Sequence, residues 1–138
     1  MSYDKPNRQK YSFGNFDFGA GTDESFSVRG PEGKAGRVWD YGVEGVIEVM
    51  NGGSTTPKIA VGTTSDPDAY GDEIDLNAVA DNEYKSVRQS YDEPEAGFAA
   101  LMLVREIPKD TEVYLTCTGA AGSPTGQGVP FCVIDWQD

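Results

Sequence analysis

The fold is decided by residues 113–136, VYLTCTGAAGSPTGQGVPFCVIDW. Alternate residues in the first and last parts of this stretch are apolar: Val113, Leu115 and Cys117, then Cys132, Ile134 and Trp136. Successive side chains of a β-strand point to opposite faces, so each part predicts a strand with one buried face. The intervening residues 119–128 are rich in turn formers. We therefore predict a β-hairpin with a long tip.

The rest of the chain shows similar short segments separated by glycine-rich turns. Strands are predicted at Ser25–Arg29, Val38–Tyr41, Val43–Met50, Lys58–Val61 and Phe98–Arg105. The third of these would also suit a helix face, but its glycines and β-branched residues favour a strand. Many short strands in a chain of 138 residues indicate a single all-β domain, a β-sandwich with jelly-roll connections.

Residues 66–95 differ from the rest because they carry ten acids and only two bases. We expect a long surface excursion with a short helix around Ile74–Ala80. Asp66, Asp68 and Asp72 echo the spacing of a calcium loop, with Gly71 at its sixth position. A calcium loop needs a glutamate at position 12, but this position is occupied by Asn77. The pattern therefore favours a solvated acidic loop over a metal site, and calcium binding is kept as an alternative.

The N-terminal residues predict an extended arm over 1–22, followed by a single sandwich domain over 23–138. Residues 1–10 are polar, and a short aromatic stretch follows them. This stretch suits either a first strand or an arm that lies on a partner. The arm residues expected to contact that partner are Lys5, Arg8, Lys10, Tyr11, Phe13, Phe16 and Phe18.

The charge distribution excludes some partners. The chain has 23 acids and 11 bases, a net charge of −12, and a surface of this sign repels nucleic acid phosphates. Residues 1–38 hold six bases and five acids, a net of +1, so the remaining residues carry −13. No run of 18 apolar residues and no signal peptide is present, which predicts a protein that stays in the cytoplasm, or in a particle assembled there, away from membranes.

Catalytic signals are sparse. The chain has no histidine, so a Ser-His-Asp or Cys-His site is impossible. Residues 30–35, GPEGKA, lack the spacing and the final Ser or Thr of a phosphate-binding loop. We therefore expect no enzyme, no cofactor and no required metal.

The two cysteines and the aromatic residues leave alternatives. Cys117 and Cys132 would face each other across the predicted hairpin, but cytoplasmic thiols usually stay reduced, which favours two buried free thiols. Trp39 and Trp136 lie within strand patterns and are expected in the core. Three tyrosines in the acidic excursion are better candidates for contact residues: Tyr70, Tyr84 and Tyr91.

Four segments carry a resemblance to a known family: RGPEGKAGRVWDY at 29–41, SDPDAYG at 65–71, IPKDT at 107–111 and PFCVIDW at 130–136. They resemble small head proteins of tailed bacteriophages, the auxiliary capsid proteins called decoration or cement proteins. This resemblance implies a β-rich homo-oligomer, often a trimer. It also implies binding to the major capsid protein on the outer surface of a virion head assembled in the host cytoplasm. It implies no catalytic residues.

Two functions follow as expectations. The first is a structural capsid protein that stabilises the shell by clamping neighbouring subunits. The alternative is a carbohydrate- or receptor-binding module of a phage tail or spike, which would use the loops at 66–95 and 119–128.

Overall fold

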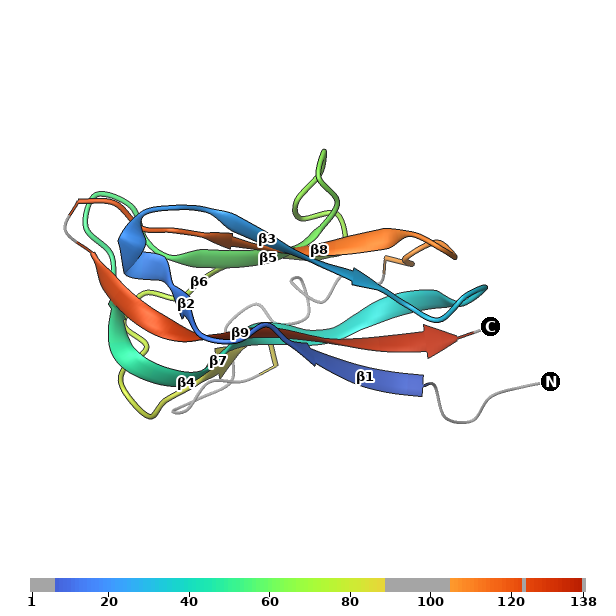
Figure 1. The fold of residues 1–138 in the computed structure, drawn as a ribbon, viewed down its shortest axis with the longest axis horizontal. Coiled ribbons are helices and arrows are strands. Elements are labelled where there is room, and N and C mark those ends of the chain that lie inside the picture. The colour runs from blue at the N-terminus through green and yellow to red at the C-terminus, as the bar shows by residue number, and fades with distance from the viewer. Residues whose placement is uncertain (1–6, 89–104, 123, 138) are drawn as a thin grey trace.

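The computed structural model describes residues 7–88, 105–122 and 124–137, and these form a β-sandwich of two antiparallel sheets (Figure 1). The described residues contain no α-helix, and the single helical element is the 3₁₀ turn η1 (Phe18–Ala20). Accordingly, this part of the chain has no helix with the length and apolarity to cross a membrane. The prediction of an all-β sandwich is confirmed.

Each sheet is built from strands that are distant in sequence. Sheet A has the order β1-β9-β4-β7, in which β2 also pairs with β9. Its strands are β1 (Asn7–Ser12), β2 (Phe16–Asp17), β4 (Ala35–Asn51), β7 (Lys85–Ser86) and β9 (Thr125–Gln137). Sheet B has the order β3-β8-β5-β6. Its strands are β3 (Glu24–Arg29), β5 (Lys58–Gly62), β6 (Gly71–Asp75) and β8 (Glu112–Thr118).

The strands predicted from alternation are present, with the predicted faces. Every alternate apolar residue of the deciding stretch is buried, on β8 and on β9. The predictions at Val38–Tyr41 and Val43–Met50 correspond to one long strand, β4, which has irregular register opposite β9. The strand predicted at Phe98–Arg105 lies almost wholly outside the described residues, and only Arg105 at its end is described, where it is exposed.

The predicted hairpin of residues 113–136 is wrong. β8 lies in sheet B and β9 in sheet A, so the chain crosses from one sheet to the other between them. Backbone N–H groups hold this crossing: Gly119 donates to Asp23 Oδ1 at 3.0 Å, and Ala120 donates to the Phe18 carbonyl at 3.0 Å. A Cβ at Gly119 would lie 2.6 Å from the Thr22 carbonyl oxygen, so the close approach requires glycine. Alternation identified the buried faces but could not identify the sheet.

The short helix predicted around Ile74–Ala80 is also wrong. β6 extends to Asp75, and the chain then turns. The Asp75 carboxylate accepts a hydrogen bond from the Asn77 N–H at 2.8 Å, and the Asn77 side chain accepts one from the Gly52 N–H at 2.8 Å. Such local side-chain bonds compete with helix formation, and Ala78 adopts a positive φ of 75°.

Residues 7–12 do not form a separate arm. They form β1, which pairs with β9 from Asn7 opposite Trp136 to Ser12 opposite Phe131. The pairing is supported by Tyr11, whose hydroxyl accepts a 2.9 Å hydrogen bond from the indole N–H of Trp136. Residues 1–6 lie outside the described part of the chain.

Trp136 is the largest fully buried side chain and lies between the two sheets. Two glycines make room for its ring, because a Cβ at Gly30 or Gly36 would lie 2.5–2.6 Å from indole carbons. The indole N–H has a partner in Tyr11, so burial leaves no polar atom unsatisfied. Positions 30 and 36 therefore have no room for a side chain, because the backbone there lies against the indole ring.

Cys117 and Cys132 are both free and fully buried, which confirms the expectation of two reduced core thiols. Burial raises the pKa of Cys132 to about 12 and raises that of Cys117 as well. Because the thiolate is the reactive species, neither thiol should react in the folded protein near pH 8. We predict no labelling by a thiol-specific reagent under native conditions, and two labels per chain after denaturation, measured by mass spectrometry. Rapid labelling of the native protein would contradict this burial.

Candidate functional site

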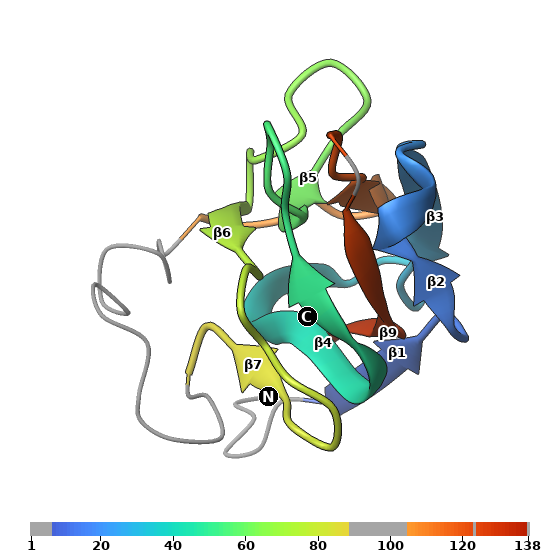
Figure 2. The same ribbon diagram turned by 90° about the vertical axis from the view of Figure 1, so that its left-hand side faces the viewer.

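Residues 7–29 form one lateral side of the sandwich. β1 and β2 lie along the edge of sheet A, η1 crosses between the sheets, and β3 returns along the edge of sheet B (Figures 1 and 2). β6 and β7 lie on the opposite lateral side (Figure 2). We call the side formed by residues 7–29 the β1–β3 side.

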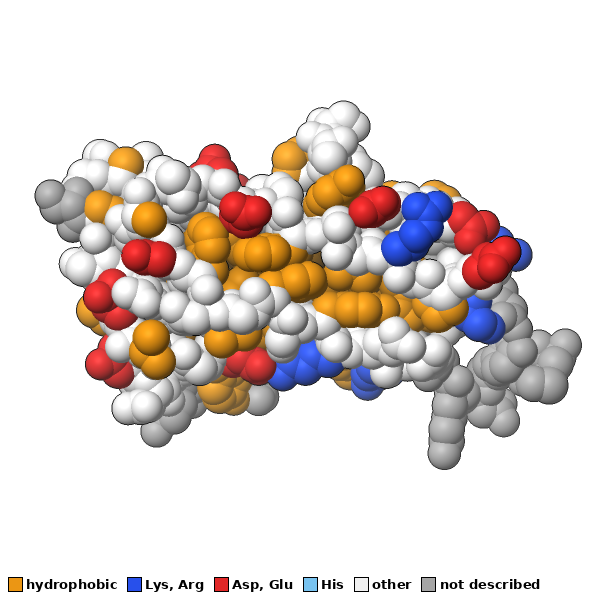
Figure 3. Space-filling view, viewed as in Figure 1, with side chains coloured by type: hydrophobic (Ala, Val, Ile, Leu, Met, Phe, Trp, Pro, Cys, Tyr) orange, Lys and Arg blue, Asp and Glu red, His pale blue; other side chains and the backbone are white. Residues whose placement is uncertain are grey.

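An aromatic seam fills the gap between the two sheet edges on this side. Its members are half-buried and pack against the core: Tyr11, Phe13, Phe16 and Phe26. The rings of Phe13 and Phe26 stack with centroids 5.0 Å apart, and Phe16 meets Phe26 edge-on at 6.1 Å. Figure 3 shows the seam as an apolar stripe along the middle of this face. Each of these rings keeps part of its surface exposed, so the stripe offers apolar area to a contacting molecule.

Phe18 differs from the other aromatic residues predicted as contacts. Its side chain has no exposed surface and belongs to the core, where its ring meets Phe16 edge-on at 4.7 Å. Its carbonyl accepts hydrogen bonds from the Ala120 and Gly21 N–H groups. A partner cannot touch Phe18 directly, so its role is to hold the seam in place.

Tyr11 joins the seam to the core. Its hydroxyl accepts from Trp136 and donates to Gln9 Oε1 at 2.7 Å. Burial raises the pKa of Tyr11, so the phenol stays neutral at physiological pH. The seam therefore carries no charge of its own.

The two basic arm residues lie instead on the outer face of sheet A. The Arg8 guanidinium makes two bonds to the Asp135 carboxylate, at 2.6 and 3.0 Å. It also lies 3.5 Å from the centre of the Trp39 ring, while Arg88 lies 3.2 Å from the same centre. Two guanidinium groups cannot share one ring face at these distances, so Trp39 lies between them. Such cation–π contacts stabilise by about 0.5–2 kcal/mol each.

Lys10 contacts β4 and β9 on the same outer face. Its ammonium group lies 2.7 and 2.8 Å from the Glu44 carboxylate oxygens and 4.8 Å from the centre of the Phe131 ring. Beside it is a shallow depression of about 370 Å³ that Tyr84 and Arg88 also line. A second depression of about 520 Å³ shares Glu44 and Tyr84 with the first.

Asp40 also lines the first depression. Burial raises the pKa of its carboxyl group, and hydrogen bonds from Ser86 and from the backbone N–H groups of Tyr41 and Arg88 oppose the shift. On the outer face of sheet A, Arg8, Lys10 and Asp40 therefore have partners within the chain, whereas the seam offers uncharged aromatic surface.

The structure divides the seven predicted contact residues. Lys5 lies outside the described residues. Arg8 and Lys10 occupy the outer face of sheet A, and Phe18 lies in the core. Only Tyr11, Phe13 and Phe16 come together, and they are joined by Phe26. Sequence analysis did not single out Phe26, although its apolar ring between Ser25 and Ser27 marks the inward face of β3.

The predictions for the other five aromatic residues have different outcomes. Trp39 is not in the core: it follows the buried Val38 on β4, so its side chain lies on the outer face of sheet A, half-buried between two arginines. Trp136 is in the core, as predicted. Tyr70 is half-buried against the core, Tyr84 lines both depressions, and Tyr91 lies outside the described residues.

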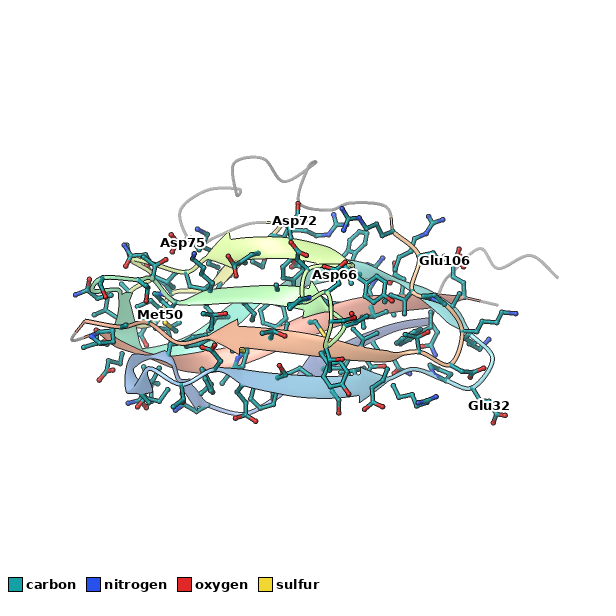
Figure 4. All side chains as sticks on the ribbon, turned by 90° about the horizontal axis from the view of Figure 1, so that it is seen from above. Glu32, Met50, Asp66, Asp72, Asp75 and Glu106 are labelled. Carbon is teal, nitrogen blue, oxygen red and sulfur yellow. The ribbon has the colours of Figure 1, made fainter. Side chains whose placement is uncertain are left out.

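The acidic residues of the calcium-like pattern lie on the β5–β6 part of sheet B and its loop, as Figure 4 shows for Asp66, Asp72 and Asp75. Within the described ranges, no three His, Cys, Asp or Glu side chains are grouped closely enough to hold a metal ion. The loop presents its negative charge to solvent, and contact with the Asp68 carboxyl group raises the pKa of Asp66.

Comparison with protein-family models, with curated proteins and with solved structures found no match. The site must therefore be interpreted from its own geometry.

The burial of Phe18 generates a prediction. Replacing it (Phe18→Ala) should lower the free energy of unfolding by about 3–5 kcal/mol, because a large core cavity forms. The control Ile47→Ala removes an apolar side chain that is 64% exposed and should change stability by less than about 0.5 kcal/mol. Urea denaturation of both variants measures the difference. Equal stability of the two variants would show that Phe18 is a surface residue.

Proposed function

We propose that this chain is a structural decoration protein that binds the outer surface of a phage head and stabilises the shell. The observation that carries the proposal is the aromatic seam of the β1–β3 side, which suits contact with another protein. Within this proposal the partner is the major capsid protein, and no catalytic step is involved.

The charge distribution supports the β1–β3 side as the contact. Residues 7–29 contain three bases and three acids, a net charge of zero: Arg8, Lys10 and Arg29 against Asp17, Asp23 and Glu24. Residues 1–6 contain one of each, so residues 30–138 carry the whole net charge of −12. A partner can approach the β1–β3 side without facing the negative field of the body, and the acidic remainder would keep decorated particles apart in solution.

The strand order supports the jelly-roll connections in this proposal. Strands 2-9-4-7 of sheet A face strands 3-8-5-6 of sheet B, with β1 continuing the edge of β2. Along the chain from β2 to β9, each connection leads to a strand of the other sheet, except the connection between β5 and β6. Rolling a long antiparallel hairpin into two sheets gives this order, and jelly rolls are frequent in viral capsids and lectins.

Co-sedimentation tests the proposal, with empty, undecorated heads of the phage that carries this gene as the probe. The unmodified protein should sediment with the heads. Phe16→Ser should weaken this binding at least tenfold, because it places a hydroxyl in the seam. Ile47→Ser, a matched loss of an exposed apolar side chain outside the β1–β3 side, should leave it unchanged. Thermal denaturation verifies that both variants are folded. Failure of the unmodified protein to sediment with heads would refute the proposal.

A second function, binding of carbohydrate by a tail or spike module, is favoured by the paired depressions on sheet A. Tyr84 and Glu44 line both of them, and Asn82 lines the larger. An aromatic ring beside carboxylate and amide groups offers both stacking and hydrogen bonds to a sugar. Binding of the isolated protein to a glycan array, abolished by Tyr84→Ala, would favour this function over shell binding.

A further inference from the structure

Within the described part of the chain, the strands at the sheet edges are β1 with β2, β7, β3 and β6, and they differ in how they are protected from pairing with another strand. Unpaired N–H and C=O groups at a sheet edge bind further strands unless charge, shortness or distortion prevents it. β1 carries exposed Arg8 and Lys10, β6 carries Asp72, Glu73 and Asp75, and β7 has only two residues. These three edges are each protected in a recognisable way.

β3 carries charge only at its two ends, Glu24 and Arg29, and its four central residues are uncharged. It has six residues and, within the described part of the chain, β8 is the one strand that pairs with it. Its outward side chains near the centre are Ser25 and Ser27, both uncharged and small. Its inward side chain at the centre is Phe26, which extends the aromatic seam to the edge. An edge of this length with an apolar inner face favours addition of a strand.

The ends of β3 indicate which strand would be added. Asp23 and Glu24 lie at its beginning and Arg29 at its end, so the strand is acidic at one end and basic at the other. Antiparallel pairing of two such strands places the acidic end of each beside the basic end of the other. A second copy of this chain therefore has complementary charge, and the β1–β3 side that it would approach has no net charge.

We propose that β3 pairs antiparallel with β3 of a second copy and joins the two B sheets into one continuous sheet. Residues directly opposite each other in an antiparallel pair lie on the same face of the sheet. In β3 the inward Phe26 has an even number and the outward serines have odd numbers. An even-numbered residue must therefore pair with an even-numbered one and an odd with an odd, so the two numbers add to an even sum. The register centred on Phe26 places Phe26 opposite Phe26 and Ser25 opposite Ser27. It also places Asp23 opposite Arg29. The register centred on Ser27 would instead place Ser25 opposite Arg29. Within one copy, Asp23 accepts the Gly119 N–H and Arg29 contacts the Asp110 carbonyl and, at 3.8 Å, Glu112. An Asp23–Arg29 contact between copies would add to these bonds, and this added contact favours the Phe26 register.

This contact is two-fold and closed, so it produces a dimer and not the trimer that the family resemblance implies. It covers the β3 edge of the seam, so under the proposed function the shell would contact the part of the seam that lies on β1 and β2. The inference is independent of shell binding, because it concerns the purified protein alone.

Sedimentation equilibrium over a wide concentration range tests the dimer. The unmodified protein should approach twice the chain mass of 14.9 kDa. Ser25→Lys should raise the dissociation constant at least tenfold, because in the proposed register the new charge lies diagonal to Arg29 and to its own copy across the interface. Ser65→Lys is the control, since it adds the same charge at another exposed serine that also has one hydroxyl contact.

The control separates local from general electrostatics. Both variants reduce the net charge of −12 by one, which on its own favours association. Weakening by Ser25→Lys alone therefore supports pairing at β3. A monomer at all concentrations, a trimer, or equal behaviour of the two variants overturns the inference. If the protein is monomeric but Ser25→Lys abolishes co-sedimentation with heads, β3 accepts a strand of the shell instead, which refutes the dimer but not the proposed function.

Cross-linking tests the register. Cross-strand Cβ atoms directly opposite each other lie about 4.5–5.5 Å apart, close enough for a disulfide after small adjustments. A mixture of Ser25→Cys and Ser27→Cys chains should form a disulfide-linked dimer under mild oxidation, more efficiently than either variant alone. The native cysteines are buried and should not interfere. Equal cross-linking of Ser27→Cys alone would overturn the Phe26 register.

Discussion

The burial of the Trp136 indole between the sheets, with its N–H bonded to Tyr11, is the constraint on which the rest of the structure depends. An indole donor buried without a partner would cost roughly 1–3 kcal/mol, so Tyr11 must reach it. That requirement fixes β1 beside β9. It also requires Gly30 and Gly36 against the ring. The same contact therefore positions the end of β3, the start of β4 and the aromatic seam.

Alternation in the sequence predicted the class of fold and most strands, because one buried face per strand imposes a period of two on apolar residues. It could not assign strands to sheets, since β8 and β9 have equivalent patterns whether they pair directly or face each other across the core. The helix expected near Ile74 failed for a different reason. The side chains of Asp75 and Asn77 accept hydrogen bonds from the backbone N–H groups of Asn77 and Gly52, and these bonds outweigh a helical pattern of only a few residues.

The candidate site was predicted in part. Aromatic residues beside a polar segment indicated an interaction surface, and three of them line the seam. Their sequence pattern does not distinguish Phe18, which is in the core, from Phe16, which is half-buried, because both lie in a region of irregular backbone. The place of Trp39 between Arg8 and Arg88 was not predictable, since it depends on two residues 80 positions apart in the sequence.

The pairing of Asn7 with Trp136 has a consequence for how the protein is made. β1 cannot complete its sheet until β9 has been synthesised, and most other connections also change sheet before finding a partner. Long-range contacts of this kind slow folding because chain entropy is lost before they form. On the ribosome, the phenylalanines of the first thirty residues would stay exposed to solvent until the last strand has been synthesised. Synthesis of this chain thus includes a vulnerable interval in which chaperones would have their greatest effect on yield.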